Sequence, residues 1–187
     1  MSGAYRYLTR LDEYSILVLG LDGSGKTTLL EKLKHTYNGV PGMDPAKIQP
    51  TVGVNMAKIR IQKCLLKFLD LGGQSDLRSI WESYFEDAHA ILYVVDASNA
   101  KRMDEAKSVL LWLTRVAELD GIPILVLANK QDTTDIQQVA QVKEMINSIA
   151  DCLDTRDVRV MGGSGIQGTG VCEAVDWLFS RIMENKK

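Results

Sequence analysis

The sequence predicts an α/β fold in a single domain: a six-stranded, mostly parallel sheet with one antiparallel edge strand and helices on both faces. Short apolar runs alternate with longer amphipathic ones along the 187 residues, as in βαβ units. A glycine-rich loop joins the first apolar run to the first amphipathic one, and two apolar runs further on are close enough to form a hairpin. The length matches one domain of the usual ~100–200 residues.

The composition is that of a folded domain without the charge pattern of a nucleic-acid-binding protein. Hydrophobic residues make up 45% of the chain, and 22 basic against 24 acidic residues give a net charge of -2, which predicts no nucleic acid partner. Three cysteines far apart favour a reducing compartment over a disulfide framework. The longest apolar runs fall short of the ~20 residues of a membrane helix, and no signal peptide opens the chain. We expect a soluble, cytoplasmic monomer.

The first part of the chain predicts a strand, a helix, a loop and a hairpin. Residues 14–19 are an apolar run, and residues 26–34 place leucines on one helical face. Residues 37–50 contain three prolines and two glycines, so we expect a surface loop without a helix. Strands at 55–61 and 64–69 are close enough to pair as a hairpin and to supply the antiparallel edge.

The rest of the chain predicts three more strands and four helices. The strands are expected at residues 91–95, 122–128 and 158–161. The helices are expected at residues 76–85, 104–119, 136–149 and 171–183. Ligands of open α/β sheets bind beyond the carboxyl ends of the strands, and every motif below lies at such an end or in an adjoining loop.

The most specific motif is a phosphate-binding loop. Residues 20–27 read Gly-Leu-Asp-Gly-Ser-Gly-Lys-Thr and fit G-x-x-x-x-G-K-[ST] between a strand and a helix. Gly23 and Gly25 let backbone N–H groups turn toward one point, where the helix N-terminus adds its partial positive charge. Lys26 offers a charge to the β- and γ-phosphates, and the Thr27 hydroxyl can ligate Mg²⁺. The motif predicts a P-loop NTPase.

A second motif, Asp70-Leu-Gly-Gly-Gln74, follows the strand at 64–69. An acidic residue at this strand end can hold the Mg²⁺ shell, directly or through water. Gly73 has no side chain, so its N–H can approach a γ-phosphate, and Gln74 is then placed to orient an attacking water. Alone, an Asp-x-x-Gly pattern is usually only a turn.

A third motif, Asn129-Lys-Gln-Asp132, follows the strand at 122–128. The Asp132 carboxylate can accept both donors on one edge of guanine, a pair that adenine lacks. Lys130 can lay its alkyl stem along the base face, and Asn129 can tie this loop to the phosphate loop. Because the three motifs occur in order, they predict guanine nucleotides, GTP and GDP, as ligands.

The order of these motifs, with Pro50-Thr-Val-Gly53 between the first two, resembles the small GTPases, specifically the ADP-ribosylation-factor (Arf/Arl) family. Asp22 in the phosphate loop, the unbroken Asp-Leu-Gly-Gly-Gln run and the segment Trp81-Glu-Ser-Tyr-Phe85 are markers of that branch. The resemblance covers about residues 14–183. It implies a Ras-like G domain at residues 14–184, preceded by an N-terminal segment at residues 1–13.

By position, the resemblance implies a complete site for nucleotide and metal. Gln74 is implied as the catalytic residue, and Thr51 as the switch I ligand of Mg²⁺ and γ-phosphate. The Gly165 N–H would contact the base oxygen at a position where the family usually has alanine. The residues implied to bind nucleotide are Asp22, Gly23, Ser24, Gly25, Lys26, Thr27, Thr28, Thr51, Gly73, Asn129, Lys130, Asp132, Ser164 and Gly165. The residues implied to bind Mg²⁺ are Thr27, Thr51 and Asp70.

The resemblance implies a GTP-hydrolysing switch that recruits effectors in its GTP state and is controlled by an exchange factor and a GTPase-activating protein (GAP). We expect slow hydrolysis without a GAP, because no residue is an evident internal arginine finger and Arg78 lies beyond Gln74. One alternative is a P-loop kinase, which leaves the motif at 129–132 unexplained. Another is a non-catalytic GTP-dependent interaction module, against which Gln74 argues.

The resemblance also implies a place in the cell. The loop at 37–50 and the Asp12-Glu-Tyr14 entry are most like the Arf-related branch, which implies vesicle transport and GTP-dependent recruitment to Golgi membranes. Ser2 precedes Gly3, so N-myristoylation is not expected. Residues 4–11 can form a short amphipathic helix for reversible membrane association; packing of this segment on the protein is the alternative.

Overall fold

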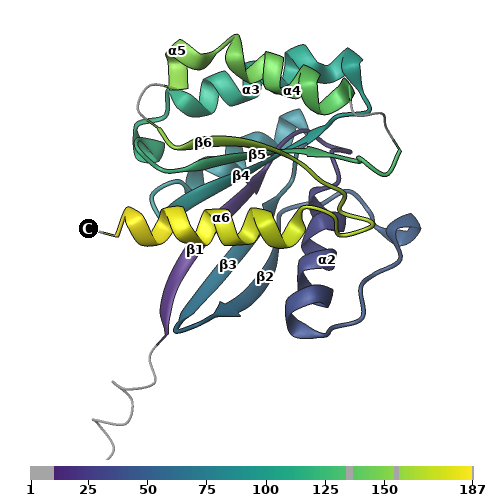
Figure 1. Ribbon diagram of the computed structural model, residues 1–187, viewed down its shortest axis with the longest axis vertical. Helices are drawn as coiled ribbons and strands as arrows, with labels where there is room; N and C mark the ends of the chain where they lie inside the picture. The colour runs from purple at the N-terminus through teal and green to yellow at the C-terminus, as the bar shows by residue number, and fades with distance from the viewer. Residues whose placement is uncertain (1–10, 134–136, 154–155, 187) are drawn as a thin grey trace, which may run out of the picture.

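The structure, a computed structural model, describes residues 11–133, 137–153 and 156–186, and it has three layers with a sheet in the middle (Figure 1). The six strands lie in the order β2-β3-β1-β4-β5-β6. They span β1 Asp12–Leu19, β2 Val54–Ile61, β3 Cys64–Leu71, β4 Ala88–Asp96, β5 Ile124–Asn129 and β6 Val158–Gly162. Strands β2 and β3 pair antiparallel and all other neighbours pair parallel, which confirms the predicted sheet.

Helices cover both faces of the sheet, as predicted. The α-helices are α2 Lys26–Asn38, α3 Met103–Thr114, α4 Gln137–Asn147, α5 Ala150–Leu153 and α6 Val171–Glu184. One apolar cluster joins α3, α4 and α5 to one sheet face, and a second joins α2 and α6 to the other (Figure 1). The helix stripes predicted from sequence therefore face the sheet.

The segment after Gln74 differs from the prediction. An α-helix is expected there at residues 76–85, and the structure instead has a 3-10 helix, η2, at Ser75–Tyr84. Its winding is tight: the Leu77 N–H donates to Gln74 O, and the Phe85 N–H donates to Glu82 O. In a 3-10 helix, side chains three residues apart lie on the same side, which matters for the contacts described below.

Other predicted bounds need correction. The helix expected at 104–119 ends at Thr114, and the chain then turns into a separate 3-10 helix, η4, at Ala117–Leu119. In the segment expected at 136–149, α4 ends at Asn147 and a turn at residues 148–149 follows, before α5 begins at Ala150; residue 136 lies outside the described residues. A further short 3-10 helix, η3 at Ala100–Arg102, leads into α3.

The predicted loop at 37–50 is not wholly without helix. Helix α2 runs on to Asn38, and a short 3-10 helix, η1, spans Pro45–Lys47. Proline is tolerated in a first helical turn because its missing N–H has no intrahelical partner there. The Asp44 carboxylate accepts the Ala46 N–H at 3.0 Å and caps this turn.

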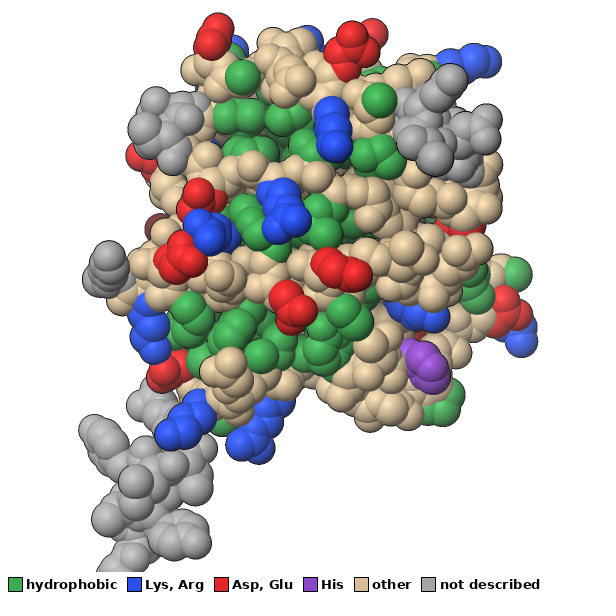
Figure 2. Space-filling model, viewed as in Figure 1, with side chains coloured by type: hydrophobic (Ala, Val, Ile, Leu, Met, Phe, Trp, Pro, Cys, Tyr) green, Lys and Arg blue, Asp and Glu red, His purple; other side chains and the backbone are tan. Residues whose placement is uncertain are grey.

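Figure 2 shows the face that carries α6, on which acidic and basic side chains are interspersed. Within the described residues, no helix is both long and apolar enough to cross a membrane. The sequence segment proposed for membrane contact, residues 4–11, lies outside the described residues apart from Leu11.

The strands of the sheet place the three motifs together at their carboxyl ends, which form one edge of the sheet. Strands β1 and β3 pair with Val18 opposite Asp70, so the second motif begins beside the entry to the phosphate loop. Strands β4 and β5 pair with Asp96 opposite Asn129. Because parallel strands end on the same side, these strand ends form the floor of the site.

Candidate functional site

The phosphate loop connects β1 to α2 and depends on its glycines. A side chain at Gly20, whose φ is 139°, would overlap the Val94 carbonyl oxygen. A side chain at Gly25, whose φ is 92°, would overlap the Asn129 amide. The loop can therefore lie close to its neighbours only with glycine at these positions.

Lys26 folds back over the loop that precedes it. The Lys26 ammonium donates to Gly20 O at 2.9 Å and to Leu21 O at 2.8 Å, and the side chain is buried. Burial lowers the pKa of Lys26 to about 8, and the nearby Asp70 carboxylate opposes that shift. Because burial keeps water away from the Lys26 ammonium, an anionic ligand such as a phosphate chain would strongly stabilise its charged form.

Three oxygen-bearing side chains meet where Mg²⁺ binding was predicted. The Thr27 hydroxyl donates to Asp70 Oδ2 at 2.7 Å and lies 2.9 Å from the Thr51 hydroxyl. Thr51 also donates to Asp70 Oδ2, at 3.3 Å. The three residues come from α2, the loop before β2, and β3, so the fold alone brings them together.

This oxygen cluster fits a magnesium ion. Asp70 is fully buried, and its Oδ1 has no hydrogen-bond partner among the described residues. Burial raises the pKa of Asp70, while hydrogen bonds from the two threonines and the charge of Lys26 oppose the shift. Hydroxyl and carboxylate oxygens are the ligands that Mg²⁺ prefers beside phosphates. The described residues hold no group of three or more His, Cys, Asp or Glu that would suit a different kind of metal site.

The second motif closes one side of the site. A side chain at Gly73 would lie 2.5 Å from Gly20 O and from Asp22 N, so only glycine lets this segment approach the phosphate loop so closely. Gln74 is exposed and lines a cavity of about 480 Å³. The cavity wall combines the phosphate loop with the 45–51 segment and the second motif; among its residues are Asp22, Gly23, Gly25, Lys26, Thr27, Thr28, Thr51, Gly73, Gln74, Lys130 and Ile166.

Asn129 links the third motif to the phosphate loop. Its side-chain amide donates to Ser24 O at 2.8 Å, and its Oδ1 accepts the Gly165 N–H at 2.9 Å. Asn129 and Ser164 are both buried. The Gly165 N–H thus has an acceptor within the protein, and its predicted contact with a base oxygen stays a prediction.

Asp132 is held in place by the loop after β6. The Ser164 hydroxyl donates to Asp132 Oδ1 and itself accepts the Gln167 N–H at 3.0 Å. The carboxylate is thereby oriented before any ligand binds, which lowers the cost of binding.

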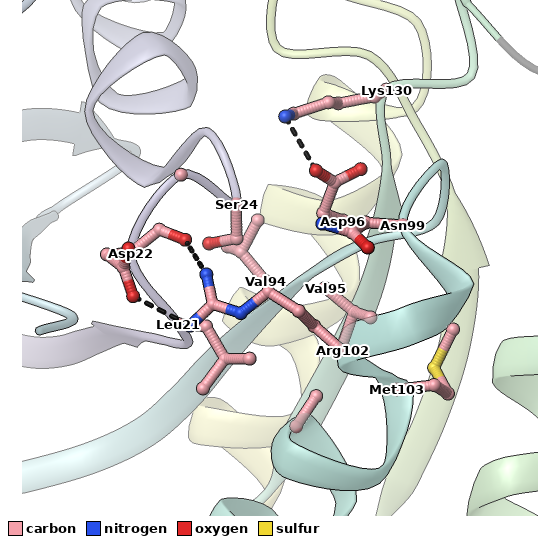
Figure 3. A pocket seen from close by; sticks show the side chains of 12 residues that line it. Leu21, Asp22, Ser24, Val94, Val95, Asp96, Asn99, Arg102, Met103 and Lys130 are labelled. Atoms are coloured by element: carbon pink, nitrogen blue, oxygen red, sulfur yellow. Dashed lines mark hydrogen bonds and ion pairs between the residues drawn. The ribbon is translucent and has the colours of Figure 1, made fainter. Parts of the chain in front are cut away.

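Lys130 and Asp96 form an ion pair of 2.7 Å between the ends of β5 and β4, drawn in Figure 3. Asp96 is the last residue of β4, at the same sheet edge as the motifs. Asp96 was not among the residues predicted from the sequence, although its place at a strand end is a signal that indicates such a site residue.

A second cavity, of about 270 Å³, lies between the phosphate loop and α3 (Figure 3). Arg102 crosses it and donates to the Asp22 carboxylate at 2.8 Å and to Asp22 O at 2.9 Å. Hydrogen bonding by Arg102 lowers the pKa of Asp22. Asp22 was predicted to contact nucleotide, and its side chain here is engaged by Arg102 beside the loop.

Taken together, the sheet and its edge define a P-loop nucleotide-binding domain of the small GTPase class. A glycine-dependent loop, an oxygen cluster for a metal and an oriented carboxylate for a base surround the space where the strands end. The structure brings all the predicted site residues to this edge of the sheet.

The chain belongs to the ADP-ribosylation factor family, whose sequence model matches residues 2–182. It is 44% identical to ADP-ribosylation factor-like protein 3 of Saccharomyces cerevisiae over 188 residues, covering 100% of this chain and 94% of that protein. It is 38% identical to ADP-ribosylation factor-related protein 1 of Bos taurus over 186 residues, covering 99% and 92%.

A solved structure is similar over nearly the whole domain. The Arl6 BBS3 small GTPase from Trypanosoma brucei, with the bound nucleotide analogue GppNp, has a TM-score of 0.76 and 27% identity, covering 92% of this chain and 98% of that one. Family and fold make this chain a guanine-nucleotide-binding switch that hydrolyses GTP to GDP and phosphate. They leave no support for the P-loop kinase alternative.

Proposed function

We propose that this GTPase recruits effector proteins in its GTP-bound state during vesicle transport at the Golgi. The proposed switch mechanism rests on one observation. Gln74, Thr51 and Lys26 line one cavity, although they come from three separate segments. A ligand whose terminal phosphate contacts all three would order the two switch segments together. Loss of that phosphate would release them.

Each motif has a role in this proposal. The phosphate loop and Lys26 bind the phosphate chain, while Asp132 accepts the two donors of guanine. Thr27, Thr51 and Asp70 would hold Mg²⁺, which neutralises charge on the phosphates when bound. Gln74 orients the attacking water in line with the γ-phosphorus, and its exposed position beside the cavity supports this role.

The contacts of the two nearby arginines support slow hydrolysis without a GAP. Arg78 donates to Gly73 O and to Glu105, and Arg102 donates to Asp22 and to Glu105. Both guanidinium groups are therefore engaged by acceptors within the protein, and neither arginine is among the residues that line the phosphate cavity. We propose that a partner supplies the missing positive charge, a contribution worth ~10³–10⁵ in rate in related enzymes.

The energy available from one phosphate is sufficient for a switch. Moving a two-state equilibrium from 1:99 to 99:1 takes ~5.5 kcal/mol. Two N–H donors, those of Thr51 and Gly73, and one Mg²⁺ ligand provide ~1.5–3 kcal/mol each. We propose that this energy shifts the β2–β3 hairpin, which begins shortly after Thr51 of switch I and ends just before Gly73 and Gln74, the first residues of switch II.

For the cellular role, similarity to the Arf-related branch supports Golgi membranes as the destination, with reversible association through residues 1–13. An exchange factor, a GAP and effectors are the expected partners of a monomer. Pull-downs with the chain loaded with GDP or a GTP analogue test effector recruitment: proteins retained only by the analogue form would support it. Equal retention by both forms would contradict a nucleotide-dependent switch.

Hydrolysis is tested by single-turnover measurements on the wild-type chain and on Gln74→Leu. If Gln74 orients the water, the variant loses ~10²-fold or more in rate and keeps its GTP affinity. Equal, measurable rates in both proteins would contradict that role of Gln74, and a wild-type rate no faster than uncatalysed hydrolysis would favour the alternative of an interaction module with negligible turnover.

A further inference from the structure

Glu105 on α3 connects the phosphate loop to the second motif. Its Oε1 accepts from Arg78 Nη2 at 2.7 Å, and its Oε2 accepts from Arg102 Nε at 3.0 Å. Arg102 in turn donates to Asp22 in the phosphate loop. The two arginines thus use both carboxylate oxygens, and hydrogen bonds from Arg78 and Arg102 lower the pKa of Glu105.

Arg78 links Glu105 to the peptide before Gln74 by hydrogen bonds to both. Its Nε–H donates to the Gly73 carbonyl oxygen at 3.2 Å while its Nη2 remains on Glu105. A peptide unit is planar, so fixing the Gly73 carbonyl also fixes the direction of the Gln74 N–H. The planar fork of arginine can make both bonds at once, which the single ammonium of a lysine does less well.

The peptide between Gly72 and Gly73 is held by η2, the helix that also contains Arg78. The buried Trp81 indole N–H donates to Gly72 O at 2.9 Å, which fixes the Gly72–Gly73 peptide and with it the direction of the Gly73 N–H. Arg78 and Trp81 are three residues apart in the 3-10 helix η2, so they lie on the same side of it. An α-helix would separate the two side chains by about 60° more of rotation around the axis.

We propose that Glu105 is a positioning residue for GTP hydrolysis: through Arg78 it holds the Gly73–Gln74 peptide so that Gln74 faces the phosphate cavity. The proposal rests on the proposed role of Gln74 in orienting water. It adds a residue from α3, outside all three motifs, to the machinery of the switch. It also gives Arg78 a role other than that of an arginine finger.

The test compares Glu105→Gln with the matched control Glu118→Gln, an exposed glutamate on η4. Glutamine keeps the size of the side chain but loses the charge and one of the two acceptors. We expect Glu105→Gln to lower the single-turnover hydrolysis rate about tenfold, with GDP affinity and melting temperature unchanged. A rate within twofold of that of Glu118→Gln would overturn the proposal.

A double-mutant cycle separates positioning through Arg78 from an independent effect. If Glu105 acts through Arg78, adding Glu105→Gln to Arg78→Ala lowers the rate no further than Arg78→Ala alone. Independent, multiplicative losses would contradict the proposed route. Equal rates in the wild-type chain and Gln74→Leu would instead overturn the proposed role of Gln74, so the two failures are distinguishable.

Hydrogen exchange gives a readout that does not depend on turnover. Amides in residues 72–78 of the GDP-loaded protein should exchange faster in Glu105→Gln than in Glu118→Gln, because the hydrogen bonds that hold this turn are weakened. Identical exchange in both variants would show that Glu105 does not hold this segment and would also overturn the proposal.

Discussion

Replacement of Asn129 by alanine removes the link between the phosphate loop and the base-binding loops. The Asn129 side chain is 2% exposed, and it makes one bond to Ser24 O at 2.8 Å and one to the Gly165 N–H at 2.9 Å. In Asn129→Ala, a buried carbonyl and a buried N–H both lose their partner. At ~1–3 kcal/mol for each unsatisfied group, the free energy of unfolding should fall by ~2–6 kcal/mol.

Asn129→Asp tests the two hydrogen bonds of Asn129 separately, because it keeps one and removes the other. A carboxylate oxygen can still accept the Gly165 N–H, but the other oxygen would face Ser24 O as an acceptor against an acceptor. We therefore expect this nearly isosteric change to be at least as destabilising as the alanine. The exposed Asn147 at the end of α4 is the matched control, and Asn147→Ala should change stability by less than about 0.5 kcal/mol.

The assay is urea unfolding at two GDP concentrations, because bound nucleotide adds to the apparent stability by mass action. The Asn129 variants should lose stability at both concentrations and should gain less from added GDP than the wild-type chain. If Asn129→Ala unfolded at the same midpoint as Asn147→Ala, the link would contribute nothing and the reasoning from buried hydrogen bonds would be refuted.

Two further predictions concern the phosphate side of the site. In Gly73→Ala the new side chain would lie 2.5 Å from Gly20 O, so the second motif cannot approach the phosphate loop, and hydrolysis should fall ~10²-fold in single-turnover assays. Gly42→Ala should behave as wild type, because a side chain there would make only ordinary contacts, at 3.9 Å from Glu31 O and 4.0 Å from His35 Cβ. The pKa of Lys26 is lowered to about 8 by burial, and phosphates bind its charged form. GTP affinity should therefore be constant below pH 8 and fall up to tenfold per pH unit above it, with proton uptake. Calorimetry between pH 7 and 9 measures this slope, and Lys26→Gln should lack it; a slope that persists in Lys26→Gln would assign it to another group.

The sequence predicted the sheet and the positions of the motifs because both depend on local signals. Strand β5 is a continuous apolar run, and the spacing of residues 20–27 is itself the requirement of the phosphate loop. The order of the strands then brings Asp70 and Thr51 to Thr27 without further information.

The contacts between motifs could not be predicted in the same way. In η2, Trp81 and Arg78 donate to the carbonyl oxygens of Gly72 and Gly73, and helix propensity contains no information about such contacts. Likewise, the pairing of Arg102 with Asp22 joins residues 80 positions apart. No pattern of residue types or spacing indicated that pair.

The central claim is that the Asp132 carboxylate selects guanine while the phosphate loop binds the phosphates. Calorimetric titration of the nucleotide-free chain with GTP and with ATP, in the presence of Mg²⁺, tests it most directly. Two hydrogen bonds to a charged acceptor, at ~1.5–3 kcal/mol each, predict that GTP binds about 10²–10⁴ times more tightly than ATP. ATP binding as tight as that of GTP would contradict the account.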